Sequence, residues 1–193
     1  MIPPLTKPFA FDDTIPGWLE PEEAEMLARL AQDKICLEIG AYRGRSTISI
    51  AQTAWLLHTI DPCWPKDDPQ VLPDLWTNLL RHNLTDTVIV HVGKSEDMYP
   101  LKCRNFFHFK FIFIDGCHEE TSVTSDLINL RINIDMGLEY LALHDYCNDN
   151  WPGVKMAADK LLGPPDLIVK SMGVYDFTER SLQCRLEALN ANG

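Results

Sequence analysis

Short, nearly continuous apolar runs recur along the chain, and each run ends at a polar residue or a glycine. Runs of this length, bounded in this way, are typical of strands that are buried on both faces of a sheet. The pattern therefore predicts strands at 35–40, 56–61, 88–93, 109–115 and 138–145.

The segments between these runs carry apolar residues three and four positions apart, which is the spacing of one face of a helix. The first such segment has acids in its first turns, where they suit the helix dipole, and the last is closed by Gly163. We predict helices at 20–31, 46–56, 71–83, 121–134 and 154–163.

Strands that alternate with helices predict an α/β fold, with a parallel sheet covered by helices on both faces. The end of the chain differs, because 167–178 and 181–189 are two strand candidates joined by a short polar turn, which predicts an antiparallel pair. Residues before position 20 are rich in proline and aromatic residues. We expect an extended arm that packs on the domain through Phe9, Phe11 and Trp18.

Composition limits the partners of the chain. Its formal net charge is −11, and its Lys and Arg residues are scattered, which argues against binding to nucleic acid or to an anionic membrane surface. No apolar stretch is long enough to span a bilayer, and the N-terminus lacks the pattern of a secretory signal. The six cysteines include no Cys-x-x-Cys pair, which favours reduced thiols in a cytoplasmic protein. We expect one domain over residues 1–193.

Ligands of parallel sheets bind where the carboxyl ends of the strands meet, so the residues after each predicted strand are the first candidates. The first strand leads into a turn that holds Gly40 and Gly44, and glycine lets a cofactor approach the backbone closely. The middle glycine of the dinucleotide fingerprint is missing. Glu38 would repel a pyrophosphate but suits a cofactor with an ammonium and a sulfonium. An ordinary turn is an equal alternative for this segment alone.

Polar groups also follow the next two strands. Asp61 stands about twenty residues after the glycines, where a carboxylate accepts hydrogen bonds from the hydroxyls of a ribose; it could also simply begin a turn before Pro62. Ser95 follows the third strand, where a small polar group can flank an adenine, cap a helix, or do both. Suitable groups at three successive strand ends favour a nucleoside-bearing cofactor.

These residues together resemble the class I S-adenosylmethionine-dependent methyltransferases. The resemblance lies in LEIGAYRGRSTISIA at 37–51, Asp61, FIDGCH at 113–118 and HDY at 144–146, and it extends over about residues 15–162. The most similar branch contains small-molecule O-methyltransferases that act on sugars of macrolides and related natural products. The resemblance implies a Rossmann-like, seven-stranded, mostly parallel sheet with an antiparallel last strand.

The resemblance also implies roles for individual residues. Glu38, Gly40 and Tyr42 would line the methionine part of S-adenosylmethionine, Asp61 would hold its ribose, and Ser95 would lie near its adenine. The full set of expected cofactor-binding residues is Glu38, Gly40, Ala41, Tyr42, Gly44, Ser46, Asp61, Ser95 and Asp115.

The acids after the fourth and fifth predicted strands suggest a metal site. If these strands are neighbours, Asp115 and Asp145 converge on one small volume, where they could share Mg²⁺ or another divalent cation. Such a cation would activate an acceptor hydroxyl, and His118 suits the base that removes its proton. Members of the similar branch bind a metal through these aspartates and use this histidine as base.

One position departs from that branch. Several relatives carry an acid directly before the second aspartate as a third ligand, and here that residue is His144. A histidine can ligate a metal but shifts the preference from Mg²⁺ toward transition metals; alternatively, this subgroup lacks the metal site.

Structural readings of the same residues compete with the metal site. Asp115 could only start a turn, and His118 could help to cap a helix. A zinc site of Cys117, His118, His144 and Cys147 is disfavoured, because the spacing matches no common zinc module.

The sequence thus predicts methyl transfer from S-adenosylmethionine to a hydroxyl of a small molecule. Trp64, Tyr146 and Trp151 could line the acceptor pocket, although aromatic residues in loops are as often packing. A metal-independent methyltransferase and a non-catalytic cofactor-binding domain are the alternatives, and a nicotinamide-dependent oxidoreductase is disfavoured. Whether the chain forms a homo-oligomer, and which acceptor it uses, is left open.

Overall fold

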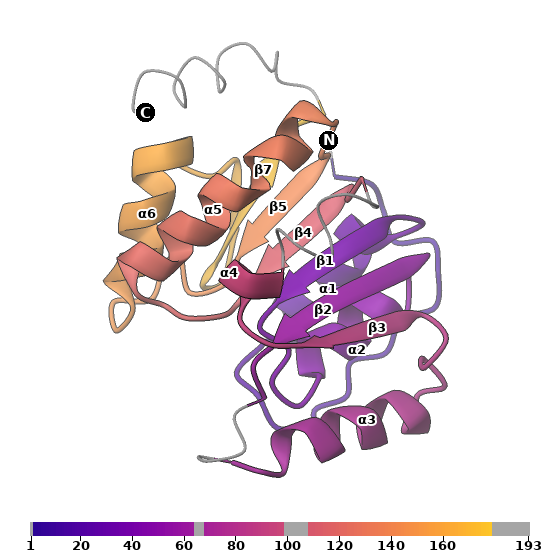
Figure 1. The fold of residues 1–193 in the computed structure, drawn as a ribbon. Helices are drawn as coiled ribbons and strands as arrows, with labels where there is room; N and C mark the ends of the chain where they lie inside the picture. The colour runs from indigo at the N-terminus through magenta and orange to yellow at the C-terminus, as the bar shows by residue number, and fades with distance from the viewer. Residues whose placement is uncertain (1, 64–67, 99–107, 179–193) are drawn as a thin grey trace.

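The protein, seen in a computed structural model that describes residues 2–63, 68–98 and 108–178, is built on a seven-stranded sheet (Figure 1). The strands follow the order β3-β2-β1-β4-β5-β7-β6. Their bounds are β1 Ile35–Ile39, β2 Leu56–Asp61, β3 Val88–Val92, β4 Phe111–Ile114, β5 Tyr140–Leu143, β6 Leu167–Val169 and β7 Met172–Asp176. Strands β1 to β5 pair in parallel, and β7 runs antiparallel to both of its neighbours. This arrangement confirms the predicted fold class and makes β4 and β5 neighbours.

The C-terminal hairpin differs from the prediction. The segment 167–178, predicted as one strand, holds both β6 and β7, and Val169 pairs with Met172 across a tight turn. The turn is made by Lys170, whose φ of 54° is left-handed, and by Ser171. A lysine gives no local sign of such a turn, since glycine or asparagine is the usual residue there. The second predicted strand, 181–189, lies outside the described residues.

Helices flank the sheet, and their bounds are α1 Pro21–Ala31, α2 Arg45–Ala51, α3 Val71–Arg81, α4 Ser95–Met98, α5 Glu120–Asp135 and α6 Pro152–Leu162. The predicted helix 46–56 ends early, at Ala51. The reason is that the Thr53 hydroxyl donates to the carbonyl of Ala28 and Leu56 already belongs to β2. In the part of the chain that the structure describes, no helix has the length and apolar character needed to cross a membrane.

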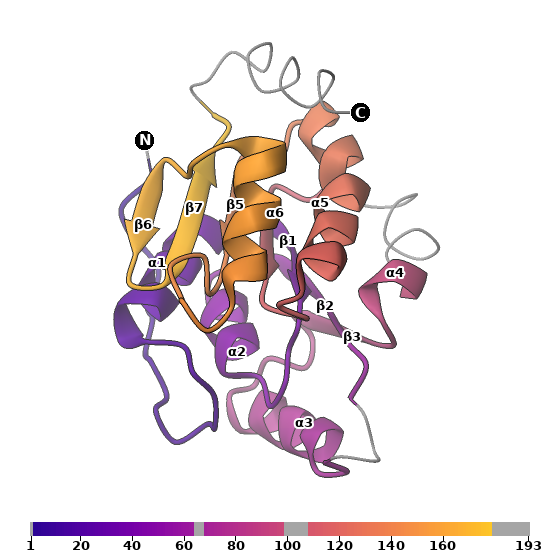
Figure 2. The same cartoon turned by 90° about the vertical axis from the view of Figure 1, so that its left-hand side faces the viewer.

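Two apolar clusters cover the two faces of the sheet. Phe111 and Phe113 of β4 pack with α1, α2 and α3, whereas Ile112 and Ile114 pack with α5 and α6. Figure 2 shows α5 and α6 together on one side of the molecule and α1 and α2 on the other. This alternation along β4 explains why the strand is an unbroken apolar run.

The N-terminal arm, residues 2–19, is held by hydrogen bonds and by buried apolar side chains. Arg45 of α2 donates to the backbone carbonyls of Asp13, Ile15 and Leu19. Ile15 and Leu19 are buried, and Phe9 and Phe11 pack against the cluster beneath the arm, as expected. Trp18 instead is 80% exposed, so it does not pack into the domain as expected.

Gly40 permits the closest approach between the first strand and the fourth. Its φ is +95°, and a Cβ there would lie 2.1 Å from the carbonyl oxygen of Asp115. Gly163, after α6, also has a positive φ, of +74°, but a Cβ there would meet no heavy atom within 4 Å. A side chain at either glycine would strain the backbone, but only a side chain at Gly40 would also collide with neighbouring atoms.

We expect Gly40→Ala to destabilise the protein more than Gly163→Ala. Both substitutions carry the cost of a strained φ, about 1–3 kcal/mol. Only Gly40→Ala adds a conflict with backbone that cannot rotate away, roughly 1–3 kcal/mol more. Urea unfolding of the two variants checks this, and equal losses would show that the backbone at Asp115 yields.

Candidate functional site

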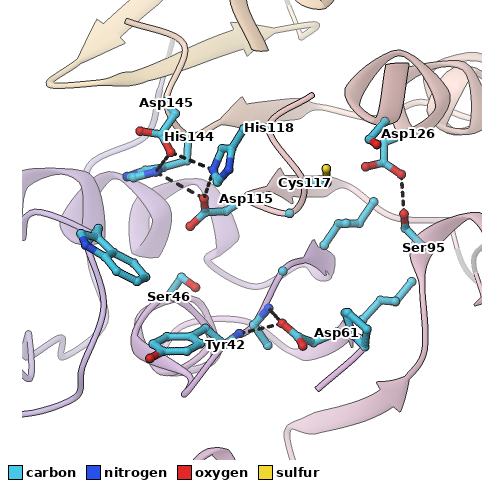
Figure 3. Close-up of a pocket in the computed structure, with 18 of the residues that line it drawn as sticks. Tyr42, Ser46, Asp61, Ser95, Asp115, Cys117, His118, Asp126, His144 and Asp145 are labelled. Atoms are coloured by element: carbon cyan, nitrogen blue, oxygen red, sulfur yellow. Dashed lines mark hydrogen bonds and ion pairs between the residues drawn. The ribbon is translucent and has the colours of Figure 1, made fainter. Parts of the chain in front are cut away.

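A cavity of about 810 Å³ opens at the carboxyl ends of β1, β2, β4 and β5. The turn after β1 forms its floor, residues 94–96 and helix α5 form one end, and residues 16–19 of the arm close the side. Figure 3 shows the polar side chains that point into it. The edge of the sheet that the sequence singled out is therefore a real pocket, and the arm is a wall that the sequence did not predict.

Asp61 ties the turn after β1 to the end of β2. Its Oδ2 accepts hydrogen bonds from the backbone N–H groups of Ala41, at 2.9 Å, and Tyr42, at 2.8 Å. Its Oδ1 accepts one from the N–H of Cys63, at 2.7 Å. Asp61, Ala41, Tyr42 and Gly40 all line the cavity, so the structure brings these predicted residues together. The glycine turn, whose role the sequence left open, is therefore fixed by Asp61, the same residue that is predicted to bind a ribose.

Glu38 stands behind the cavity wall instead of lining it, which differs from the prediction. Its carboxylate is fully buried and accepts hydrogen bonds from the hydroxyls of Ser46, Thr47 and Thr59, at 2.6–2.7 Å. Burial raises the pKa of Glu38 to about 7 against the effect of these donors. Ser46 does line the cavity. The acid therefore joins β1, α2 and β2 and reaches the cavity only through Ser46.

Gly44 also lies away from the cavity. A Cβ at this position would be 2.7 Å from a methyl group of Leu75 in α3, so the glycine allows helix packing. Gly44 is also the N-cap residue of α2, with a left-handed φ of +94°. Gly44 therefore packs against α3, and its contact with a cofactor stays a prediction.

Ser95 faces a buried acid at the far end of the cavity. Its Oγ donates a hydrogen bond of 2.6 Å to Oδ1 of Asp126 in α5, and both residues line the cavity (Figure 3). Burial raises the pKa of Asp126 to about 6, and the charge of Glu96 adds to this effect. Sequence reasoning missed Asp126, because it lies inside a predicted helix and follows no strand.

Asp115, His118, His144 and Asp145 form a compact cluster beside the glycine turn (Figure 3). The Nδ1 of His144 lies 3.2 Å from Oδ2 of Asp145 and 3.3 Å from Oδ1 of Asp115. The Nε2 of His118 lies 3.0 Å from the same oxygen of Asp145 and 3.7 Å from that of Asp115. Nitrogens and oxygens therefore alternate around a small central space. The predicted convergence of β4 and β5 is confirmed.

The charges of this cluster reinforce one another. The carboxylates of Asp115 and Asp145 raise the pKa of His118 to about 9, although its Nε2 makes no well-directed hydrogen bond among the described residues. Burial would raise the pKa of Asp145, but His118, His144 and Asn148 hold it well below its usual range. A cation bound by the two carboxylates would oppose their effect on His118.

His144 is held from behind by a residue that the sequence analysis treated only as a first-turn acid. Glu23 of α1 is fully buried, and its Oε2 lies 3.2 Å from Nε2 of His144. Burial would lower the pKa of His144, but Asp115, Asp145 and Glu23 raise it. No local signal links Glu23 to a residue 121 positions away, so only the fold could reveal this contact.

The donor atoms fit a divalent cation. Asp115, His144 and Asp145 each offer one ligand atom, and these atoms lie within 4.8 Å of one another. Neighbouring ligands on a six-coordinate cation with bonds of about 2.1 Å are roughly 3 Å apart. The Nδ1 of His144 lies at a similar distance, 3.3 and 3.2 Å, from the oxygens of Asp115 and Asp145. Cys117 and Cys147 are exposed free thiols outside this group, so the geometry does not support the zinc alternative.

Of the aromatic residues proposed for the acceptor pocket, only some lie at the cavity. Trp151 lines the cavity and stacks on His118, with ring centroids 4.6 Å apart. Tyr146 is buried and donates to Asp159 instead, and Trp64 lies outside the described residues. Trp18 of the arm, which the sequence did not select, lines the cavity and contacts the ring of Tyr42. The exposed face of Trp18 is thus explained by its place at the pocket.

Comparison with known proteins gives a family and a shared fold. The family described as a methyltransferase domain matches residues 37–153. An O-methyltransferase from Bacillus cereus, solved in complex with SAH, is 20% identical with a TM-score of 0.62, over 78% of this chain and 74% of that one.

Two further solved structures have the same fold. TomG, an O-methyltransferase from Streptomyces achromogenes involved in tomaymycin synthesis and solved with SAM, is 20% identical with a TM-score of 0.57, over 77% and 71% of the two chains. CalS11, a TDP-rhamnose 3'-O-methyltransferase of calicheamicin biosynthesis, is 15% identical with a TM-score of 0.61, over 81% and 77%.

We expect the stability of the protein to fall relative to that of an Asp126→Asn variant as the pH rises from about 5 to about 7.5. The pKa of Asp126 is about 6 in the folded state, against an ordinary value of 3.8 for an unburied group. At pH values between these two pKa values the folded state binds more protons than the unfolded state. The resulting contribution of Asp126 to stability is therefore complete below the unfolded pKa and is lost as the pH rises through the folded pKa. The expected relative change is on the order of 1 kcal/mol.

Urea unfolding of both proteins at the two pH values, without ligand, measures this change. Asp86→Asn, at an exposed aspartate, removes the same charge from the surface and serves as the control. A relative stability of Asp126→Asn that does not vary with pH would show that Asp126 is ionised throughout.

Proposed function

Since the chain belongs to the methyltransferase domain family, we propose that it is an S-adenosylmethionine-dependent O-methyltransferase that acts on a hydroxyl of a small molecule. One observation carries the proposal. The Gly40 turn tied by Asp61 and the cluster of Asp115, His118 and Asp145 face the same cavity. A methyl donor bound at the first and a hydroxyl bound at the second would be neighbours.

The donor would lie along the carboxyl edge of the sheet. The backbone of Gly40, Ala41 and Tyr42 would border its methionine part, because the glycine turn lets a ligand approach the backbone closely. Asp61 retains one lone pair, on Oδ1, for a ribose hydroxyl, since a carboxylate has about four acceptor sites and three are used by backbone N–H groups. Ser95 marks the end of the cavity for the adenine. The complexes of similar proteins with SAH and SAM support this choice of cofactor.

The acceptor would bind between the cluster and the arm. His118 is the candidate base, and its stacking on Trp151 fixes the ring beside Asp145. Asp115, Asp145 and His144 would hold a divalent cation. When bound, such a cation would lower the pKa of an acceptor hydroxyl and orient it. Transfer to the hydroxyl then depends mainly on the proximity and alignment of donor and acceptor, both of which would be bound in the same cavity.

A metal-independent methyltransferase is the second candidate, and one observation favours it. Each carboxylate of the cluster already lies within ion-pair distance of both histidines. The four side chains could therefore balance their charges without a cation. In that case Asp115 and Asp145 would orient His118 and shape the pocket.

We expect the protein to bind S-adenosylmethionine, and Asp61→Ala to weaken binding at least tenfold, about 1.4 kcal/mol. The variant loses the ribose acceptor and the anchor of the Ala41–Tyr42 turn together. Isothermal calorimetry measures both affinities, with Asp86→Ala as an exposed control and thermal unfolding to confirm that each variant folds. A wild-type protein that binds no cofactor at millimolar concentration would refute the proposal.

We expect His118→Ala to lower kcat by roughly a hundredfold or more, as is typical of the loss of a general base. The release of S-adenosylhomocysteine, followed over a panel of sugars, catechols and other hydroxyl compounds, identifies an acceptor and then gives the rate. Glu119→Gln changes the adjacent exposed residue, whose side chain makes no cap hydrogen bond, and should retain activity. Full activity of His118→Ala would exclude this histidine as the base.

A further inference from the structure

We propose that Glu23 is a positioning residue that holds His144 as a nitrogen ligand, so that the centre prefers a transition-metal cation to Mg²⁺. This inference rests on the metal assistance in the proposed function. It assigns a role to a residue of α1 that is remote in sequence from the cluster. It also turns the unexpected histidine at position 144 into a statement about which cation the centre takes.

The carboxylate of Glu23 is itself fixed on all sides. Its Oε1 accepts hydrogen bonds from the N–H of Ser171, at 3.0 Å, and from its hydroxyl, at 2.9 Å. Its Oε2 accepts one from the N–H of Glu20, at 2.9 Å, and faces His144. A buried acid is stable only with such donors. Helix α1 and the hairpin turn between β6 and β7 therefore place this carboxylate rigidly.

Glu23 in turn fixes the ring of His144. One ring nitrogen, Nε2, faces the carboxylate of Glu23, whereas the other, Nδ1, faces Asp115 and Asp145. A carboxylate that faces one ring nitrogen keeps the hydrogen on that nitrogen. Carboxylates also face Nδ1, so without a cation the ring carries a hydrogen on both nitrogens. A cation bound between Asp115 and Asp145 would displace the hydrogen on Nδ1 and leave a lone pair there. That lone pair points to the place where the two carboxylate oxygens converge.

The ring has little freedom to turn away. The side chain of His144 is only 5% exposed, and its ring packs edge-on against Phe113 of β4, with centroids 6.3 Å apart. A nitrogen donor is thus built into the centre. Mg²⁺ and, to a lesser degree, Mn²⁺ prefer oxygen ligands, whereas Co²⁺ and Zn²⁺ bind imidazole more tightly. The set of two carboxylates and one imidazole therefore favours the second group.

The experiment uses the full chain, freed of metal by a chelator, with Co²⁺, Mn²⁺ and Mg²⁺ as separate probes. Calorimetry gives each affinity, and the visible absorption of bound Co²⁺ reports nitrogen coordination without any assay of activity. We expect Co²⁺ to bind at least tenfold more tightly than Mg²⁺, and Mn²⁺ to bind with an affinity between the two. Glu23→Gln should lower Co²⁺ affinity by about 10–100-fold, as the loss of such a partner usually does.

Two further variants make the test specific. Ser171→Ala removes the hydroxyl from the other oxygen of Glu23 but leaves His144 untouched, so its Co²⁺ affinity should stay within about threefold of wild type. His144→Asn replaces the ring by a neutral oxygen donor and should lower the Co²⁺-to-Mg²⁺ preference at least tenfold. If Glu23→Gln does not fold, the Co²⁺-to-Mg²⁺ preference of His144→Asn tests the nitrogen ligand that Glu23 is proposed to hold. A preference in that variant equal to that of the wild type overturns the inference.

Failure of the inference is distinguishable from failure of the proposed function. A wild-type protein that binds S-adenosylmethionine but none of the three cations overturns the metal centre alone, and means that the ring of His144 fills the place of the cation. Tighter binding of Mg²⁺ than of Co²⁺ overturns the stated preference. Unchanged Co²⁺ affinity in a folded Glu23→Gln variant overturns the role of Glu23.

Discussion

The contact between Gly40 and the backbone of Asp115 is the constraint on which the site depends. The residues that follow β1 and β4 can lie this close only because position 40 has no side chain to meet the carbonyl of Asp115. Their closeness brings the turn tied by Asp61 and the cluster around Asp115 to one cavity. A larger separation would leave two unrelated polar patches. The chemistry is therefore set first by backbone packing and only then by the ionisable groups.

The acids around the cavity differ in how their burial is compensated. Glu38 is surrounded by hydroxyls, and Asp126 has one hydroxyl and a nearby like charge, so burial raises the pKa of both. Asp145 instead faces two histidines, which lower its pKa. The carboxylate of Asp145 therefore keeps its negative charge, which can balance a bound cation or a protonated histidine.

The sequence could predict whatever is encoded locally and repeated by the sheet. Buried apolar runs located β1 to β5, and their polar ends located Asp61, Asp115 and Asp145, because parallel strands all end at one edge. It could not reveal the turn at Lys170, because a lysine there occupies a left-handed position that usually holds glycine or asparagine. Nor could it tell that the side chain of Glu38 points to α2 instead of into the pocket, since an apolar strand pattern does not show where the side chain of one acid within it points.

Two of the contacts that escaped prediction, those of Trp18 and Glu23, share a physical origin, which is the packing of α1 and the arm across the ends of the strands. Trp18 and Glu23 both belong to this segment, and one reaches the cavity while the other reaches His144 behind it. A histidine in place of an acid at position 144 needs a partner for its second ring nitrogen, because a buried polar atom without one is costly. Glu23 supplies that partner and is in turn held by Ser171. Position 144 and position 23 are thus one structural unit, so the chemistry of the cluster cannot be inferred from the strand ends alone.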